Sequence, residues 1–149
     1  MYSVKVIGAG SIGHHLTHAA RSLGWDVTLC DVDEAALKRT KEQIYPGRYG
    51  RWDDHIVLQP VEDVPRGGYD LICIGTPPDS HLALALSALE EKPRGLLVEK
   101  PLCTPDLAGA QALFERAAET GCPVFVGYDH VVSKATLLME GILRSGELG

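Results

Sequence analysis

The chain has 149 residues, 45% of them hydrophobic and 23% charged, with a formal net charge of -6 at pH 7. This length suits one globular domain with a sizeable core. The acidic balance argues against a nucleic acid or an anionic membrane as partner, because both require a basic surface. No segment reaches the roughly 20 apolar residues of a membrane helix, and the N-terminus lacks the pattern of a secretion signal, so a cytoplasmic location is expected.

The first half of the chain alternates apolar, β-branched runs with helical patterns. In chain order these patterns predict a strand, a helix, a strand, a helix and a short strand, at residues 4–7, 12–23, 27–30, 34–44 and 56–58. Asp33 is the expected N-cap of the second helix. Residues 45–54 contain a proline and two glycines and predict a loop, and residues 60–68 predict a run of turns.

The second half continues the alternation. It predicts a strand, a helix, a strand, a helix, a strand and a helix, at residues 71–74, 81–91, 95–98, 106–120, 124–126 and 134–143. Strands that are continuous apolar runs separated by helices indicate a parallel sheet covered on both faces. With right-handed crossovers this is an α/β, doubly wound Rossmann fold of three layers in a single domain.

A glycine-rich turn joins the first strand to the first helix. The sequence GAGSIG follows the strand directly and opens the helix, which is the context that a dinucleotide-binding turn requires. Gly8 permits the tight turn, Gly10 lets the backbone approach a pyrophosphate, and Gly13 lets the helix pack close to the strand. The free N–H groups at the helix start, around Ser11 and Ile12, would then hold the phosphates. The alternative is that the glycines serve only the turn.

Asp31 supplies the second half of this pattern. It ends the second strand, 18 positions after Gly13, where an acid accepts hydrogen bonds from the adenosine ribose. A carboxylate there would repel a 2′-phosphate, so NAD is the expected cofactor in preference to NADP. The alternative is a helix N-cap or a solvated loop acid, although Asp33 is the better cap.

Three polar clusters follow the later strands of the predicted sheet. They are GTPPDSH at residues 75–81, EKP at residues 99–101 and GYDH at residues 127–130. Open parallel sheets place their ligands at the carboxyl ends of the strands. The three clusters are therefore expected to converge on one crevice.

Together with the glycine turn, these motifs resemble the Gfo/Idh/MocA family of oxidoreductases, named after glucose–fructose oxidoreductase and inositol dehydrogenase. In that family an N-terminal Rossmann domain binds the dinucleotide, and a following α/β domain supplies most of the substrate site. The resemblance covers essentially the whole chain. It identifies residues 1–149 as the dinucleotide-binding domain, ending at the junction sequence GELG, without the second domain.

The resemblance implies a function for the parent protein. This would be an NAD-dependent oxidoreductase that transfers hydride between the cofactor and a sugar, polyol or related hydroxyl or carbonyl compound. The isolated chain is expected to be inactive, and any homo-oligomer would form mainly through the second domain. Two alternatives remain open: a stand-alone NAD-binding sensor or regulatory module, and reduction of an unsaturated substrate in the manner of biliverdin reductase or dihydrodipicolinate reductase.

Carried over residue by residue, the resemblance also assigns the site. Gly75, Thr76 and Pro77 would line the cofactor near its pyrophosphate and nicotinamide ribose, and His81 would sit beside them. The alternative for His81 is a helix-start histidine that satisfies backbone groups.

The EKP cluster would lie closest to the chemistry. Glu99 would approach the nicotinamide ribose, and Lys100 would reach towards the nicotinamide and the reacting carbinol. Lys100 would thus contact the cofactor and be the catalytic residue, because an ammonium stabilises the charge that develops on the reacting oxygen. A cis peptide bond before Pro101 would aim Lys100 inward. The alternative is a solvated Lys100 paired with Glu99.

The third cluster departs from the family pattern. In that pattern an aromatic residue is followed by Asn, and Arg stands two positions after the Asn. This chain has Tyr128, Asp129 and Val131 instead, which puts substrate contacts from this segment in doubt, and His130 is as easily a surface residue as a ligand contact. The family's acid/base histidine belongs to the second domain. The sequence DDH at residues 53–55 looks similar but precedes the third strand.

No metal site is expected. His14 and His18 share a helix face, but no third or fourth ligand is in sequence reach. The four cysteines, at positions 30, 73, 103 and 122, form no CxxC pair and are expected to be reduced and structural.

Overall fold

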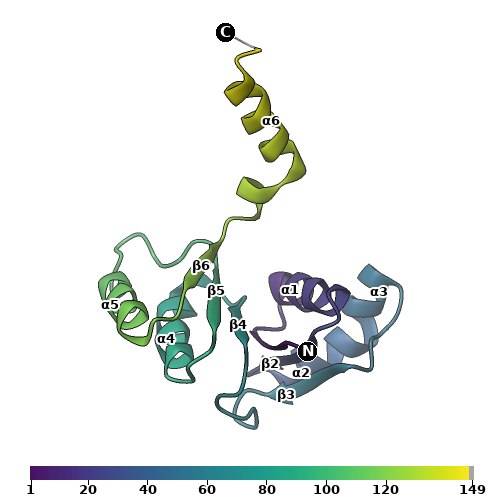
Figure 1. Cartoon of the computed structure of the whole chain (residues 1–149). Helices are drawn as coiled ribbons and strands as arrows, with labels where there is room; N and C mark the ends of the chain where they lie inside the picture. The colour runs from purple at the N-terminus through teal and green to yellow at the C-terminus, as the bar shows by residue number, and fades with distance from the viewer. Residues whose placement is uncertain (148–149) are drawn as a thin grey trace.

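The computed structural model describes residues 1–147 as a six-stranded parallel sheet flanked by helices (Figure 1). The strand order is β3-β2-β1-β4-β5-β6. The strands are β1 Ser3–Ile7, β2 Asp26–Asp31, β3 Ile56–Pro60, β4 Leu71–Ile74, β5 Gly95–Glu99 and β6 Val124–Gly127. The helices are α1 Ser11–Ser22, α2 Glu34–Arg39, α3 Tyr45–Tyr49, α4 Pro78–Leu89, α5 Ala110–Thr120 and α6 Lys134–Ser145. Two further segments are the π-helical η1 Thr40–Ile44 and the 3-10 helix η2 Asp129–Val132. The expected Rossmann fold is confirmed.

Alternation along the strands divides the core between the two faces of the sheet. On β1, Val4 and Val6 point into a core shared with α1, α2 and α3, whereas Ile7 points into a core shared with α4 and α5. Because both faces are covered, the strands are apolar on both sides, which explains their continuous apolar runs.

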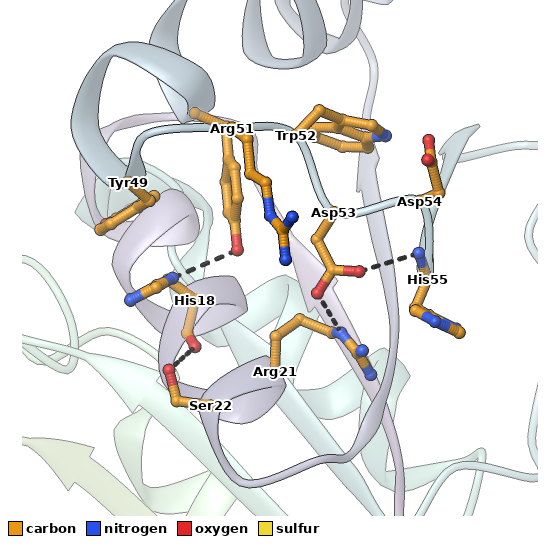
Figure 2. Close-up of a pocket in the computed structure, with 10 residues that line it drawn as sticks. His18, Arg21, Ser22, Tyr49, Arg51, Trp52, Asp53, Asp54 and His55 are labelled. Carbon is orange, nitrogen blue, oxygen red and sulfur yellow. Dashed lines mark hydrogen bonds and ion pairs between the residues drawn. The ribbon is translucent and has the colours of Figure 1, made fainter.

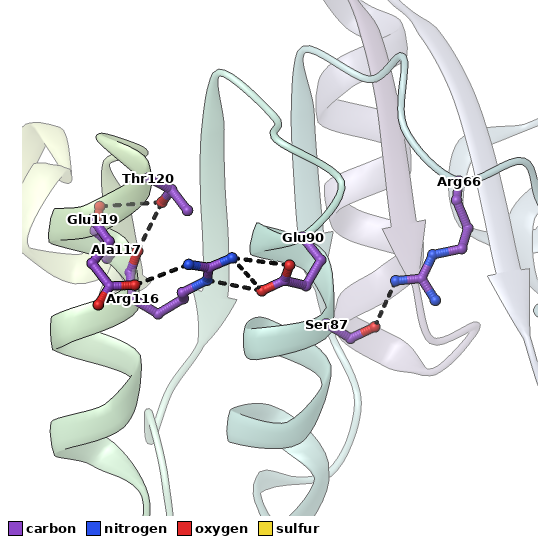
Figure 3. Close-up of polar contacts among 7 residues, drawn as sticks. All are labelled: Arg66, Ser87, Glu90, Arg116, Ala117, Glu119 and Thr120. Atoms are coloured by element: carbon purple, nitrogen blue, oxygen red, sulfur yellow. Dashed lines mark hydrogen bonds and ion pairs between the residues drawn. The ribbon is translucent and has the colours of Figure 1, made fainter.

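Helices α4 and α5 lie side by side on their face of the sheet and are joined at their ends (Figure 3). The guanidinium of Arg116 donates to both carboxylate oxygens of Glu90, from Nε at 2.8 Å and from Nη2 at 2.9 Å. A third donation reaches Glu119 on α5 itself, at 2.9 Å. This bidentate pair is exposed and therefore adds little free energy, but it fixes the relative position of the two helices.

The predicted loop at residues 45–54 was wrong in its first half. Helix α2 continues through the π-helical turn of η1 into α3, and Tyr45 is only 3% exposed. Pro46 does not break the helix: it is the second residue of α3, directly after the π-helical turn, where the regular α-helical hydrogen-bond pattern is already interrupted. Burial of Tyr45 therefore favours the helix more than Pro46 and Gly47 favour a turn.

Two other helix boundaries differ from the prediction. Helix α4 begins at Pro78 rather than at residue 81, since a proline suits the first helical turn. Helix α5 begins at Ala110 rather than at residue 106, after Gly109, whose φ is +87°. Asp33 caps α2 as predicted and accepts a hydrogen bond from the Ala35 N–H at 2.9 Å.

Helix α6 projects away from the sheet (Figure 1). All its residues except Ile142 are exposed, including the apolar Leu137, Leu138 and Leu143. Of the expected junction at residues 146–149, Leu148 and Gly149 lie outside the described residues. Within residues 1–147, no helix combines the length and the apolar character that crossing a membrane requires.

Candidate cofactor site

Strand register sets the functional positions in a row along the carboxyl edge of the sheet. Ile7 is level with Cys30 on β2 and with Ile74 on β4, so Gly8, which follows β1, lies between Asp31 at the end of β2 and Gly75, which follows β4. Farther along the same edge, Glu99 is level with Gly127. The row follows directly from parallel pairing, because every strand presents its carboxyl end to the same edge.

A cavity of about 510 Å³ opens at this edge, between the glycine turn and the start of α4. Six of the predicted cofactor residues line it: Gly8, Gly10, Asp31, Gly75, Thr76 and Pro77. They come from three segments far apart in the sequence. The structure thus brings the glycine turn, the second-strand acid and the first polar cluster to one place.

The glycines differ in what a side chain would meet. A Cβ at Gly13 would lie 1.8 Å from the carbonyl oxygen of Gly8, and a Cβ at Gly8 would lie 2.9 Å from Cγ2 of Thr76. Gly8 also has a φ of +104°, which L side chains rarely adopt. A Cβ at Gly10 would meet nothing closer than 3.9 Å. Gly8 and Gly13 are therefore required by the fold, whereas Gly10 leaves open space above the turn.

The carboxylate of Asp31 ties the end of β2 to the glycine turn. Its Oδ2 accepts from the Ala9 N–H at 2.6 Å, and its Oδ1 accepts from the Asp33 N–H at 2.9 Å. A carboxylate has about four acceptor positions, so two remain for a ligand. Its negative charge is part of the cavity lining.

His81 lies beneath the cavity rather than in its lining. Its side chain is fully buried, with Nε2 2.7 Å from the carbonyl oxygen of Thr76 and Nδ1 2.8 Å from that of Pro101. Each ring nitrogen thus lies within hydrogen-bond distance of a backbone carbonyl oxygen. His81 thereby joins the cluster after β4 to the cluster after β5. This agrees with the alternative given for His81, a helix-start histidine that satisfies backbone groups.

Glu99 and Lys100 lie at the same edge but outside the lining of the cavity. Lys100 is exposed, and its backbone N–H donates to Oε2 of Glu99 at 2.9 Å. The peptide bond between Lys100 and Pro101 is cis, as expected. The Glu99 carboxylate is directed towards β6, where a Cβ at Gly127 would lie 2.6 Å from its Oε1.

The third polar cluster is not brought into the cavity. Tyr128 is 56% exposed, and the side chains of Asp129 and His130 are 80% and 94% exposed, 3.8 Å apart. Asp129 and His130 belong to η2, which Tyr128 directly precedes and which leads to α6. Of the three clusters that were expected to converge on one crevice, only the first lines the cavity. The second is connected to the first through His81, and the third lies apart.

The cavity also has an apolar lining that the motifs did not indicate. It comprises Ile7, Val32, Val61, Ala83 and Leu84, together with the hydroxyl of Ser80. Val32 is 82% exposed although it is apolar, and the Val61 N–H donates to the carbonyl oxygen of Asp31 at 3.1 Å. The sequence could have indicated Val32 and Val61 by their positions. Each is an apolar residue directly after a strand, the second and the third, and therefore lies at the same edge of the sheet.

A second, larger cavity of about 630 Å³ lies at the opposite, amino edge of the sheet (Figure 2). It lies between the second half of α1, α3 and the segment before β3, and it contains the sequence DDH at residues 53–55. Arg21 donates to Asp53 at 2.8 Å across it. Burial raises the pKa of Asp53, but hydrogen bonds from Arg21 and the His55 N–H outweigh burial and hold that pKa below its ordinary value.

The cysteines are free and buried, in agreement with the expectation of reduced, structural thiols. Burial raises the pKa of Cys73 to about 12 and that of Cys30 to about 11, so neither side chain is a ready nucleophile. In the part of the chain that the structure describes, no three His, Cys, Asp or Glu side chains gather in a way that could hold a metal ion.

The fold and the glycine turn define the class of protein, a Rossmann-type dinucleotide-binding domain. A sequence model of the oxidoreductase family with an NAD-binding Rossmann fold, Gfo/Idh/MocA, matches residues 2–128. The chain therefore belongs to this family. A search of curated protein sequences finds no match.

Solved structures share the fold at low sequence identity. One is a scyllo-inositol dehydrogenase from Lactobacillus casei with bound NAD(H) and scyllo-inositol, with a TM-score of 0.77 and 19% identity over all of this chain. Another is a UDP-N-acetylglucosamine 3-dehydrogenase from Acidithiobacillus ferrooxidans, with a TM-score of 0.71 and 21% identity over 93% of this chain. A third is a biliverdin reductase from Synechocystis with biliverdin and NADP+, with a TM-score of 0.68 and 19% identity over 95% of this chain. In each case the chain spans 42% of the other protein.

Proposed function

We propose that this chain binds NAD(H) in the cavity at the carboxyl edge of the sheet, on behalf of an oxidoreductase. The substrate class we propose is a sugar, polyol or related hydroxyl or carbonyl compound. The observation that carries the proposal is the shared cavity, in which six predicted residues from three separate segments meet. Family membership supports the cofactor, and the dehydrogenases of similar fold support the substrate class.

The residues present fit a dinucleotide. The space above Gly10, where a Cβ would meet nothing within 3.9 Å, accommodates a phosphate close to the backbone. Helix α1 starts there without a side-chain cap, so its first N–H groups are available to phosphate oxygens. The apolar Val32 and Val61 offer faces for an adenine ring.

Asp31 would select between the two nicotinamide dinucleotides. Its unused acceptor positions suit the hydroxyl groups of an adenosine ribose, whereas a 2′-phosphate would meet a like charge. We therefore propose a preference for NAD(H) over NADP(H).

The chemistry would take place beyond the cavity described, near Lys100. The dinucleotide, when bound, supplies the hydride acceptor or donor. The exposed ammonium of Lys100 would hold a hydrogen bond to the reacting oxygen of the substrate and stabilise negative charge that develops on it. Glu99 and His81 would fix the backbone on either side of Lys100 through the Lys100 N–H and the Pro101 carbonyl oxygen.

The remainder of the substrate site is a further part of the proposal. Because the chain spans 42% of each relative, we propose that the whole protein also carries a substrate domain of the kind found in the family. That domain would supply the acid/base residue and the main oligomer contacts. The exposed Tyr128 and Asp129 would lie on the side of the Rossmann domain nearest to it.

Calorimetric titration with NADH and NADPH tests the cofactor proposal. We expect the wild-type chain to bind NADH more tightly, and Asp31→Ala to remove most of that preference. Lys100→Ala should bind NADH about as well as the wild type, because the role proposed for Lys100 concerns the substrate. If the folded wild-type chain binds neither dinucleotide, the proposed function is wrong for this chain.

A further inference from the structure

Helix α3, which the sequence did not predict, places an arginine over the glycine turn. From this helix, Nη1 of Arg48 donates to the carbonyl oxygen of Ser11, and Nη2 donates to Ser11 Oγ, both at 3.1 Å. Ser11 is the first residue of α1 and follows Gly10 directly. A residue 37 positions away in the sequence is thereby fixed to the first turn of the proposed cofactor site.

The charge of Arg48 is not neutralised by the protein. In the described part of the chain, no carboxylate lies within 4.0 Å of its guanidinium. The start of α1 has no side-chain cap and no acidic residue in its first turn. An unpaired guanidinium thus lies against the first residue of α1, next to Gly10 in the cavity lining, and together with the positive end of the helix it favours an anion.

The contact also prepares Ser11 as a donor. Because Ser11 Oγ accepts from Arg48, the hydroxyl proton of Ser11 is directed elsewhere, and no described residue accepts it. A guanidinium has five N–H groups and uses two in these contacts, so three remain for a ligand. Arg48 and Ser11 can therefore donate to the same anion.

We infer that Arg48 is a binding residue for the pyrophosphate of the dinucleotide, acting through its own N–H groups and through the Ser11 hydroxyl. The inference rests on the proposed cofactor site and adds a charged contact to its neutral backbone donors. We assign the pyrophosphate, rather than a 2′-phosphate, as the group that Arg48 would contact. Arg48 is bound at Ser11, in the first turn of α1, whereas the proposed ribose position is next to the negatively charged Asp31.

The positive charge of Arg48 also affects a titratable side chain in α1. Burial first, and then the charges of Arg48 and His15, lower the pKa of His14, three positions after Ser11. This agrees with a guanidinium held over the first turn of α1, as the two hydrogen bonds show.

Calorimetric titration of the 149-residue chain with NADH, NADPH and ADP-ribose tests the inference. Arg48→Ala should weaken the binding of NADH and ADP-ribose about tenfold, the effect of losing one charge-assisted hydrogen bond at a partly solvated site. Arg48→Gln, which keeps a donor but removes the charge, should weaken both ligands less. The matched control is Arg51→Ala, which removes another exposed arginine three positions on, from the cavity at the opposite edge, and should leave all affinities unchanged.

The outcomes separate the inference from the proposed function. If wild type and Arg51→Ala bind NADH while both Arg48 variants, folded by circular dichroism, bind it equally well, Arg48 is not a binding residue and the cofactor site stands. If the Arg48 variants weaken NADPH alone, the contact belongs to a 2′-phosphate and the inference is wrong. If wild type binds neither NADH nor ADP-ribose, both proposals fail together.

Discussion

The two edges of the sheet each carry a cavity, and they differ in how the surrounding charges are balanced. At the amino edge, Arg21 and Asp53 neutralise each other across the larger cavity (Figure 2). At the carboxyl edge, the glycine turn leaves backbone donors open and Arg48 has no acidic partner in the described chain. A carboxylate that already accepts from an arginine gains little from a ligand, whereas an unpaired donor gains a partner.

The largest expected effect breaks the turn itself. Gly13→Ala should destabilise the fold by about 3 kcal/mol and abolish NADH binding, because the new Cβ would lie 1.8 Å from the Gly8 carbonyl oxygen. Urea denaturation and calorimetry measure the two effects. Gly47→Ala on α3 is the matched control, since a Cβ there meets nothing within 4 Å, and a small stabilisation is expected. Equal stability of the two variants would contradict the described turn.

The next effect tests the link beneath the cofactor edge. His81→Ala removes a fully buried ring whose nitrogens contact the carbonyl oxygens of Thr76 and Pro101, so a loss of about 2–3 kcal/mol in unfolding free energy is expected. His81→Asn, which can donate to one of the two, should recover part of it. A variant as stable as wild type would show that the two clusters are held together by other contacts.

A smaller effect is expected at the amino edge. Asp53→Asn should cost about 1 kcal/mol at neutral pH, because it weakens a partly exposed ion pair, and it should leave NADH affinity unchanged. The folded-state pKa of Asp53 is lowered, so its contribution is present above the unfolded pKa and is lost as pH falls through the folded value. The difference between variant and wild type should therefore close below about pH 4. A change in NADH affinity would link the two edges.

The smallest effect concerns His14 on α1, between the two edges. Burial, with Arg48 and His15, lowers its pKa from the ordinary value of 6.5. The unfolded chain then takes up a proton below pH 6.5 that the folded chain does not, so stability falls as pH drops from 6.5 towards the folded pKa. His14→Gln should flatten the dependence of unfolding free energy on pH in that window. An unchanged slope would assign the dependence to other groups.

The sheet and the carboxyl edge were predictable because their signals are local. Apolar runs predicted the strands, and the spacing from Gly8 to Asp31 predicted two of the segments that line the cavity. Helix α3 was not predictable from local signals, because Pro46 and Gly47 favour a turn and only the burial of Tyr45 against α1 overrides them. Arg48 was missed for the same reason.

Side-chain partners formed across elements were also beyond the sequence. Lys5 lies between apolar residues of β1, and its side chain is buried and paired, at 2.5 Å, with Glu91, which lies just after the end of α4. His81 could be assigned to the edge but not to a position beneath it, because its depth depends on where α4 begins. Register and periodicity locate a residue along an element, whereas its partners depend on packing.

The projection of α6 has a consequence for how the chain unfolds. A helix of 12 residues is marginal in water on its own, and the exposed side chains of α6 gain almost nothing from the sheet. Its amide protons should therefore exchange with solvent far faster than those of β1, whose exchange requires opening of the sheet. We therefore expect the two parts to unfold as separate cooperative units. Any surface that covers Leu137 and Leu138 would slow exchange in α6 while leaving the melting temperature of the sheet unchanged.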